Sequence, residues 1–302
     1  MSFRDPFVER FATHPDWGRF MPPPPPLPAD RNPIDLVGVD APLTRLKRSE
    51  TTDDPIWNGI AARINAYPLR TSDQCSEQHY HDVFDFLRIN NGVVRRVVEC
   101  GVFHGGLSVQ LAGCALASDL SIDLVDVDPG ALLATWHRIA RTFPEALDRV
   151  RLFCGELPNY VQAVMHDPAF DNALVHHDGS HRFNVVMRDL SALYFVRKRV
   201  HALIIQDTHL RHSDPDNGCF VDAAVAAVFG FDPHYQPIGV TFPGTTFPVG
   251  YVPGERHNVY FQGGRPEGMM IPFAENTFLY PHPLIHTIDD FVQCPATPRA
   301  VA

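Results

Sequence analysis

The sequence of 302 residues contains no apolar run that approaches the roughly 18 residues a membrane-spanning helix needs. Residues 1–6 also lack the apolar core of a signal peptide. The six cysteines are too few for a disulfide scaffold, and no two of them have C-x-x-C spacing. We therefore expect a soluble, cytoplasmic protein without a membrane partner.

An excess of positive charge is also absent. The chain has 25 Lys and Arg residues against 35 Asp and Glu residues, a formal net charge of −10. An acidic surface repels phosphate backbones, so we expect no nucleic-acid partner. The one basic run, 197–199, ends a predicted helix, where positive charge complements the helix dipole.

Proline, in contrast, is abundant, with 28 residues concentrated toward the two ends of the chain. Five consecutive prolines occupy 22–26, and such a run adopts an extended polyproline II form. We expect the first 50 or so residues to be irregular and to form an arm. This arm would lie across the domain or on a neighbouring subunit, which would allow a homo-oligomer to form through it.

Between these flanks, short apolar runs alternate with amphipathic segments. Strands are predicted at 97–100, 122–127, 150–153, 172–177 and 201–206. Helices are predicted before, between and after these strands, and they include 76–90, 131–143 and 220–229. This alternation predicts an α/β fold: a doubly wound, Rossmann-like, mostly parallel sheet with helices on both faces and irregular proline-rich flanks. Ligands bind beyond the carboxyl ends of the strands in this class.

We divide the chain into three parts on this basis. Residues 1–75 are the proline-rich arm and lead-in, 76–231 are the ligand-binding core, and 232–302 complete the sheet and supply a loop-rich substrate lid. The last part contains many aromatic residues among its prolines and glycines, which would suit a lid over a small molecule.

The first predicted strand runs into a glycine turn and a helix start. Glycines there let the backbone approach a ligand, and a helix start presents unpaired N–H groups. The turn, E-C-G-V-F-H-G-G from Glu99, does not have G-x-G-x-x-G spacing, which disfavours a dinucleotide. The carboxylate of Glu99 would repel a pyrophosphate and suit a cationic ligand.

This turn resembles that of class I S-adenosylmethionine-dependent methyltransferases, in the macrocin O-methyltransferase and cephalosporin-hydroxylase-like branch. Four further strand ends resemble family motifs: L-V-D-V-D-P from Leu124, C-G-E from Cys154, D-G-S-H-R-F from Asp178 and Q-D-T-H from Gln206. The resemblance covers about residues 76–231. It implies S-adenosylmethionine as cofactor and methyl transfer to a small-molecule acceptor, at a hydroxyl oxygen.

The resemblance also implies roles for particular residues. Asp126 corresponds to the acid that binds the ribose hydroxyls, and Glu156 lies in the adenine-side turn. The full cofactor-binding set is Glu99, Gly101, Val102, Phe103, Gly105, Gly106, Ser108, Asp126, Val127, Gly155, Glu156 and Asp178.

For the chemistry, His181 matches the position of a general base in catechol-type relatives, and an imidazole suits that role. Asp178 and His209 complete the predicted catalytic set. In metal-dependent relatives the corresponding acids bind Mg²⁺, which here predicts Asp178, Asp207 and Thr208 as ligands, although a threonine is a poor one.

Histidines crowd this region, and with the two acids they could instead bind zinc. They are His176, His177, His181, His201, His209 and His212. Against a zinc site, His176 and His177 are adjacent in a strand and therefore point to opposite faces.

Two other functions remain open from the sequence. One is an NAD(P)-dependent oxidoreductase on a similar sheet, which the carboxylate of Glu99 disfavours. The other is a non-catalytic cofactor-binding or scaffold protein that keeps the fold, which the threonine at position 208 and the proline arm would suit.

Overall fold

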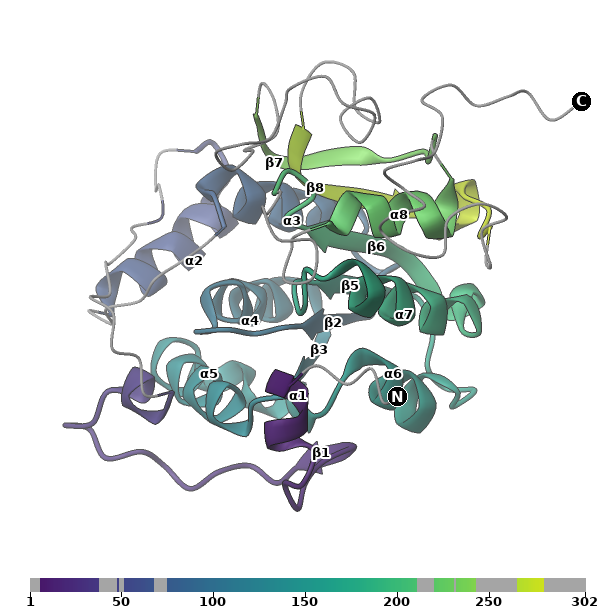
Figure 1. The fold of residues 1–302 in the computed structure, drawn as a ribbon. Helices are drawn as coiled ribbons and strands as arrows, with labels where there is room; N and C mark the ends of the chain where they lie inside the picture. Colours follow the sequence, from purple (N-terminus) through teal and green to yellow (C-terminus); the bar gives the residue numbers. More distant parts are fainter. Residues whose placement is uncertain are drawn as a thin grey trace, which may run out of the picture.

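An eight-stranded sheet runs through the computed structural model (Figure 1), which describes residues 6–37, 48, 52–67, 75–210, 220–230, 232–242 and 265–279. The strand order is β1-β4-β3-β2-β5-β6-β8-β7. The strands are β1 (Arg19–Met21), β2 (Arg96–Cys100), β3 (Ser121–Asp126), β4 (Val150–Cys154), β5 (Ala173–His177), β6 (Val200–Gln206), β7 (Gln236–Phe242) and β8 (Arg265–Pro272).

Five of these strands, β4, β3, β2, β5 and β6, are mutually parallel, and the others pair antiparallel at the two sides. The chain winds from β2 outward to β4, then returns to β5 and winds the other way. The order therefore reverses between β2 and β5, which is where a doubly wound sheet opens a ligand crevice.

Helices cover both faces of the sheet and bury an apolar cluster on each. One cluster contains residues of α6, α7 and α8, and the other contains residues of α2, α3, α4 and α5. The helices are α1 (Pro6–Phe11), α2 (Pro55–Ala66), α3 (Glu77–Ile89), α4 (Gly106–Ser118), α5 (Pro129–Thr142), α6 (Leu157–Tyr160), α7 (Phe183–Tyr194) and α8 (Val221–Phe229). Short 3-10 turns span Pro33–Leu36, Pro144–Arg149, Arg197–Arg199 and Phe273–Glu275, and a π-helical turn spans Val161–Met165.

The predicted fold class is confirmed, and the five predicted parallel strands all lie in the sheet. Element ends differ from the prediction by a few residues. Helix α5, for example, begins at Pro129 rather than 131, because the Asp128 side chain accepts a hydrogen bond from the N–H of Gly130 at 2.7 Å. A capping aspartate followed by proline at the first helical position is a strong start signal.

The prediction that the first 50 residues are irregular is wrong for part of that segment. Residues 6–37 contain α1, β1 and a 3-10 turn. Strand β4 offers an unpaired edge, and β1 pairs with it antiparallel, with Phe20 opposite Phe153. A three-residue strand beside a proline run leaves no periodic pattern, so local sequence could not predict it.

The proline run itself has neither helix nor strand, as expected. Its continuation is held on the core by Arg141, whose guanidinium donates to the carbonyl of Pro28 at 3.0 Å. Residues 6–37 thus pack on their own domain, and an oligomer formed through the arm stays a prediction.

Aromatic residues after position 232 were expected in a substrate lid. Phe273 and Phe278 pack against Phe229 of α8, with ring centroids 5.9 and 4.7 Å away, and the substrate lid stays a prediction. Phe247, Tyr251, Tyr260 and Phe261 lie outside the described residues. Within the described ranges, no helix has both the length and the apolar character to cross a membrane.

Candidate functional site

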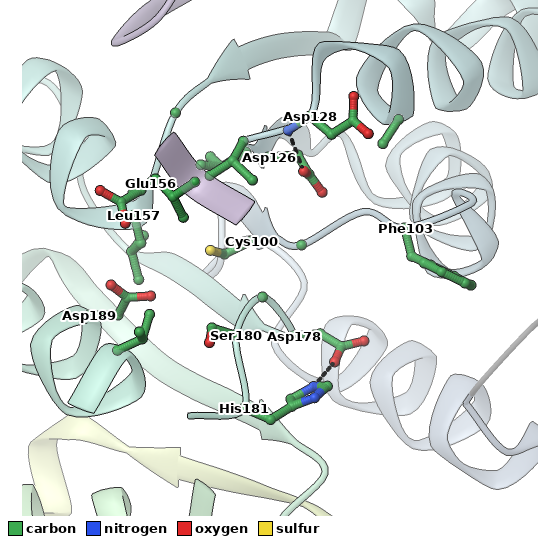
Figure 2. Close-up of a pocket in the computed structure, with 18 of the residues that line it drawn as sticks. Cys100, Phe103, Asp126, Asp128, Glu156, Leu157, Asp178, Ser180, His181 and Asp189 are labelled. Atoms are coloured by element: carbon green, nitrogen blue, oxygen red, sulfur yellow. Dashed lines mark hydrogen bonds and ion pairs between the residues drawn. The ribbon is translucent and has the colours of Figure 1, made fainter. Parts of the chain in front are cut away.

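A cavity of about 630 Å³ opens where the parallel strands end, around the point at which the strand order reverses (Figure 2). Its walls come from the loops that follow β2, β3, β4 and β5, together with the first half of α7. Eight of the predicted site residues line it: Gly101, Phe103, Asp126, Val127, Gly155, Glu156, Asp178 and His181. The cavity thus lies at the predicted edge of the sheet.

The turn after β2 lies directly against the turn after β5. The N–H of Asp178 donates to the carbonyl of Cys100 at 2.7 Å. Gly101 has a φ of 86°, and a Cβ there would collide with the backbone carbonyl of Asp178. Only glycine fits this close approach, which brings the two loops together at the cavity floor.

Asp126, the last residue of β3, presents a carboxylate to the cavity. One of its oxygens accepts from the N–H of Val102 and the other from the N–H of Asp128, both at 2.8 Å. Burial raises the pKa of Asp126 to about 6, against the lowering effect of these hydrogen bonds. The carboxylate is held rigidly, and its remaining lone pairs can accept hydrogen bonds from ligand hydroxyls.

Carboxylates outnumber cations on the cavity wall. Glu156 and Asp189 share the guanidinium of Arg188, which contacts Asp189 at 3.2 Å. The lining carboxylates are Asp126, Asp128, Glu156, Asp178 and Asp189, and the lining arginines are Arg182 and Arg188. Such a wall attracts a positively charged ligand and repels a pyrophosphate.

Asp178, His181 and Asp207 form a group at the ends of β5 and β6. The Nε2 atom of His181 lies 3.3 Å from Asp178 and 3.1 Å from Asp207, and one ligand atom of each residue lies within 4.8 Å of the others. Burial and the charge of Asp178 raise the pKa of Asp207 to about 7, opposed by His181. Asp207 also has a φ of 61°, in the left-handed region that non-glycine residues adopt infrequently.

Two other predicted catalytic or metal residues are not brought into this group. The hydroxyl of Thr208 is fully buried and donates to the carbonyl of Pro266 at 2.7 Å. The ring of His209 stacks on Phe242 with centroids 4.2 Å apart, and burial lowers the pKa of His209.

Several predicted cofactor residues lie outside the cavity lining: Glu99, Val102, Gly105, Gly106 and Ser108. Glu99 is buried with a relative exposure of 2% and is paired in register with His176. Because side chains alternate along a strand, Cys100 faces the cavity and Glu99 the opposite face. Glu99 was expected to supply negative charge at the ligand site. In the structure, the carboxylates that line the cavity supply that charge.

The crowded histidines are dispersed among different partners. His176 contacts His79 with their Nε2 atoms 3.0 Å apart, whereas His177 contacts Asp189 at 3.1 Å on the other face. His201 contacts Asn90, and His212 lies outside the described residues. The described histidines therefore do not assemble into one zinc centre.

Sequence reasoning missed several lining residues. Val8 of α1 reaches the cavity from the N-terminal arm, and no sequence signal links the two. Asp189 interrupts the apolar stripe of α7, and such a buried acid within a stripe is a signal that could have been used. Cys100 and Arg188 also line the cavity.

Comparison with known proteins gives a family match over part of the chain. Residues 98–207, a little over a third of the sequence, match the family model Methyltransf_24, described as a methyltransferase domain. This segment runs from within β2 to just past the end of β6 and includes the loops that form most of the cavity. No curated protein matches the chain.

Solved structures of O-methyltransferases are similar to the chain at low identity. TomG from Streptomyces achromogenes, involved in tomaymycin synthesis and solved with S-adenosylmethionine, is 13% identical and has a TM-score of 0.46, covering 80% of this chain and 96% of its own. An O-methyltransferase from Bacillus cereus, solved with S-adenosylhomocysteine, is 13% identical and has a TM-score of 0.48, covering 74% and 92%.

Proposed function

We propose that the protein is an S-adenosylmethionine-dependent methyltransferase that transfers a methyl group to a hydroxyl oxygen of a small-molecule acceptor. The observation that carries this proposal is the carboxylate-rich cavity at the carboxyl ends of β2, β3, β4 and β5, with Asp126 at the end of β3. The family match over residues 98–207 supports the same chemistry.

The cavity lining suits the ribose, the positively charged groups and the adenine of S-adenosylmethionine. Asp126 has two oxygens fixed by backbone N–H groups and facing the cavity, which suits a ribose diol. The sulfonium and the ammonium group of S-adenosylmethionine are positive, and the carboxylates of the wall favour them. Glu156 and Gly155, after β4, are the proposed adenine-side residues.

Bound S-adenosylmethionine supplies an activated methyl group. The protein then has to align the acceptor with the S–CH3 bond, exclude water and remove the hydroxyl proton. We propose that His181 accepts the hydroxyl proton. The Nε2 atom of the resulting imidazolium would lie 3.3 Å from the carboxylate of Asp178 and 3.1 Å from that of Asp207. The two carboxylates orient the ring and stabilise its charge, as an acid does beside a catalytic imidazole.

A magnesium ion does not fit this group well. Mg²⁺ prefers an octahedral shell of oxygen atoms. The third predicted ligand, Thr208, directs its hydroxyl to a backbone carbonyl, and an imidazole stands between the two carboxylates. No step of the proposed mechanism depends on Mg²⁺.

Calorimetry with S-adenosylhomocysteine tests the cofactor assignment. We expect binding in the micromolar range or tighter, and no detectable binding to Asp126→Ala. Thermal-shift measurements with NAD and NADP provide the matched comparison, since the acidic wall should reject both. Folded protein that binds neither S-adenosylmethionine nor S-adenosylhomocysteine, or binds NAD(P) instead, would refute the proposal.

Turnover tests the role of His181. Methyl transfer to a panel of catechols, sugars and hydroxylated amino-acid derivatives should identify an acceptor. His181→Ala should then lower kcat by about 10²- to 10⁴-fold, the usual contribution of a general base. Binding of S-adenosylhomocysteine should change little. An unchanged kcat would remove His181 from the mechanism.

A further inference from the structure

A second group of potential ligands lies beside the same cavity, with two of its three members in the lining, apart from Asp178, His181 and Asp207. It consists of Cys100, His177 and Asp189, and one ligand atom of each lies within 4.8 Å of the other two. We propose that these three side chains bind one divalent transition-metal ion of the zinc class. The proposal does not depend on the proposed methyltransferase activity.

The sheet register holds two of the ligands together. Cys100 and His177 are the last residues of the neighbouring strands β2 and β5 and are direct Cα partners, so their side chains leave the same face side by side. Asp189 reaches them from α7, with its Oδ2 atom 3.1 Å from Nε2 of His177. Three ligands from rigid elements form a preorganised site.

The donor atoms and spacing suit zinc. Cysteine sulfur, histidine nitrogen and aspartate oxygen are the usual zinc ligands, at bond lengths of about 2.3, 2.0 and 2.0–2.2 Å respectively. A tetrahedron with those bonds separates its ligand atoms by about 3.3–3.7 Å. The Nε2 atom of His177 and the Oδ2 atom of Asp189 are 3.1 Å apart, slightly closer than in that tetrahedron, and the Cys100 sulfur lies within 4.8 Å of both.

The charge balance also favours a divalent ion. All three side chains are buried, with relative exposures of 7% for Cys100, 1% for His177 and 4% for Asp189. A thiolate, a carboxylate and a neutral imidazole around one divalent cation sum to zero, which an apolar core accommodates far better than separate charges.

Residues around the proposed metal site provide a hydrogen-bonding partner for one of the ligands and leave a fourth coordination position open. Arg188 contacts the other carboxylate oxygen of Asp189 at 3.2 Å, which fixes the orientation of that ligand. Cys100 and Asp189 both line the cavity, and in Figure 2 the Cys100 sulfur points to the side where Asp189 lies. Three protein ligands with a fourth position open to a cavity are typical of zinc sites that exchange a water or a solute.

Cobalt titration of the metal-free full-length protein tests the site. One equivalent of Co²⁺ should produce a thiolate-to-cobalt charge-transfer band in the near ultraviolet, and Cys100→Ser should lose it. Asp207→Asn is the control, because it alters the separate group of Asp178, His181 and Asp207. This variant should keep the band. Arg188→Met should weaken cobalt binding by about 10- to 100-fold, the usual effect of removing an outer partner.

A folded wild-type protein without this band, or a band that persists in Cys100→Ser, overturns the proposal. If circular dichroism shows that Cys100→Ser does not fold, X-ray absorption on the zinc-loaded wild type decides. One sulfur at about 2.3 Å with nitrogen and oxygen neighbours supports the site. A coordination sphere without sulfur, or no retained zinc, refutes it.

Discussion

The carboxylate of Asp126 faces a ligand cavity and is held in place by two backbone N–H groups. Its pKa is raised to about 6, mainly by burial. The protonated form accepts fewer hydrogen bonds than the carboxylate, so the affinity for a ribose diol depends on ionisation near neutral pH.

A pH series of cofactor affinity follows from that pKa. Because Asp126 is ionised above about pH 6 and protonated below it, the Kd for S-adenosylhomocysteine should be constant above pH 7. It should rise by about tenfold per pH unit well below the pKa, as for any ligand that requires one ionised group. Asp126→Asn should bind weakly with a flat profile over this range. A wild-type Kd that does not change between pH 5 and pH 7.5 would contradict the assignment.

Motifs could predict which residues stand at the strand ends, but not the direction of every side chain. Asp126, Asp178 and Gly101 were predicted at strand ends from the order of a family motif, and all three line the cavity. Glu99 lies outside the cavity lining. Side chains alternate along a strand, so Glu99, one position before Cys100, points to the opposite face of the sheet. The hydrogen bond from Thr208 to Pro266 joins residues 58 positions apart and leaves no local pattern.

At the scale of elements, the short helix α1 closes one side of the cavity. Val8 lines the cavity with a relative exposure of 7%, and Val37, after the 3-10 turn, lines it as well. In Figure 1 this N-terminal segment lies beside the ends of the central strands. The arm therefore contributes apolar surface to the proposed cofactor site.

Substitution of Val8 tests this contribution. Val8→Ser should weaken S-adenosylhomocysteine binding by about fivefold, equivalent to roughly 1 kcal/mol of lost apolar contact. Glu9→Ser on the same helix is the matched control, since Glu9 is exposed, and it should bind as the wild type does. Equal affinities for the two variants in calorimetry would exclude α1 from the site.

The five parallel strands and the longer helices of the central core were predictable because each is long enough for its periodicity to show, whereas the four-residue helix α6 was not predicted. Helix α3, for instance, begins after Ser76, whose side chain accepts from the N–H of His79 at 3.1 Å. Strand β1 and helix α1 have three and six residues and owe their conformation to the edge of β4 and the core beneath them. Such elements follow from tertiary contact rather than from local sequence.

At the scale of the whole molecule, a buried charge network joins three neighbouring strands. Asp123 of β3 is fully buried and accepts hydrogen bonds from Arg96 of β2 at 3.0 Å and from Arg151 of β4 at 2.7 and 2.8 Å. The hydroxyl of Tyr160 donates to the same carboxylate. The network fixes the sheet that carries the cavity loops.

Removal of this carboxylate should destabilise the whole fold. Asp123→Ala leaves the partly exposed guanidinium groups of Arg96 and Arg151 and the buried hydroxyl of Tyr160 without their acceptor, and it should lower the free energy of unfolding by about 2–3 kcal/mol. The exposed pair of Arg63 and Glu145 provides the control, and Glu145→Ala should cost about 0–1 kcal/mol. Denaturant unfolding followed by circular dichroism measures both, and similar losses would contradict this view of the network.

A crystal structure with bound S-adenosylhomocysteine would show whether the cavity holds the cofactor in the orientation that methyl transfer requires. We expect the ribose hydroxyls on Asp126, the adenine beside Gly155 and Glu156, and the sulfur atom facing the group of Asp178, His181 and Asp207. A ligand bound elsewhere, or bound in the cavity with its sulfur turned away from His181, would contradict the proposed methyl transfer.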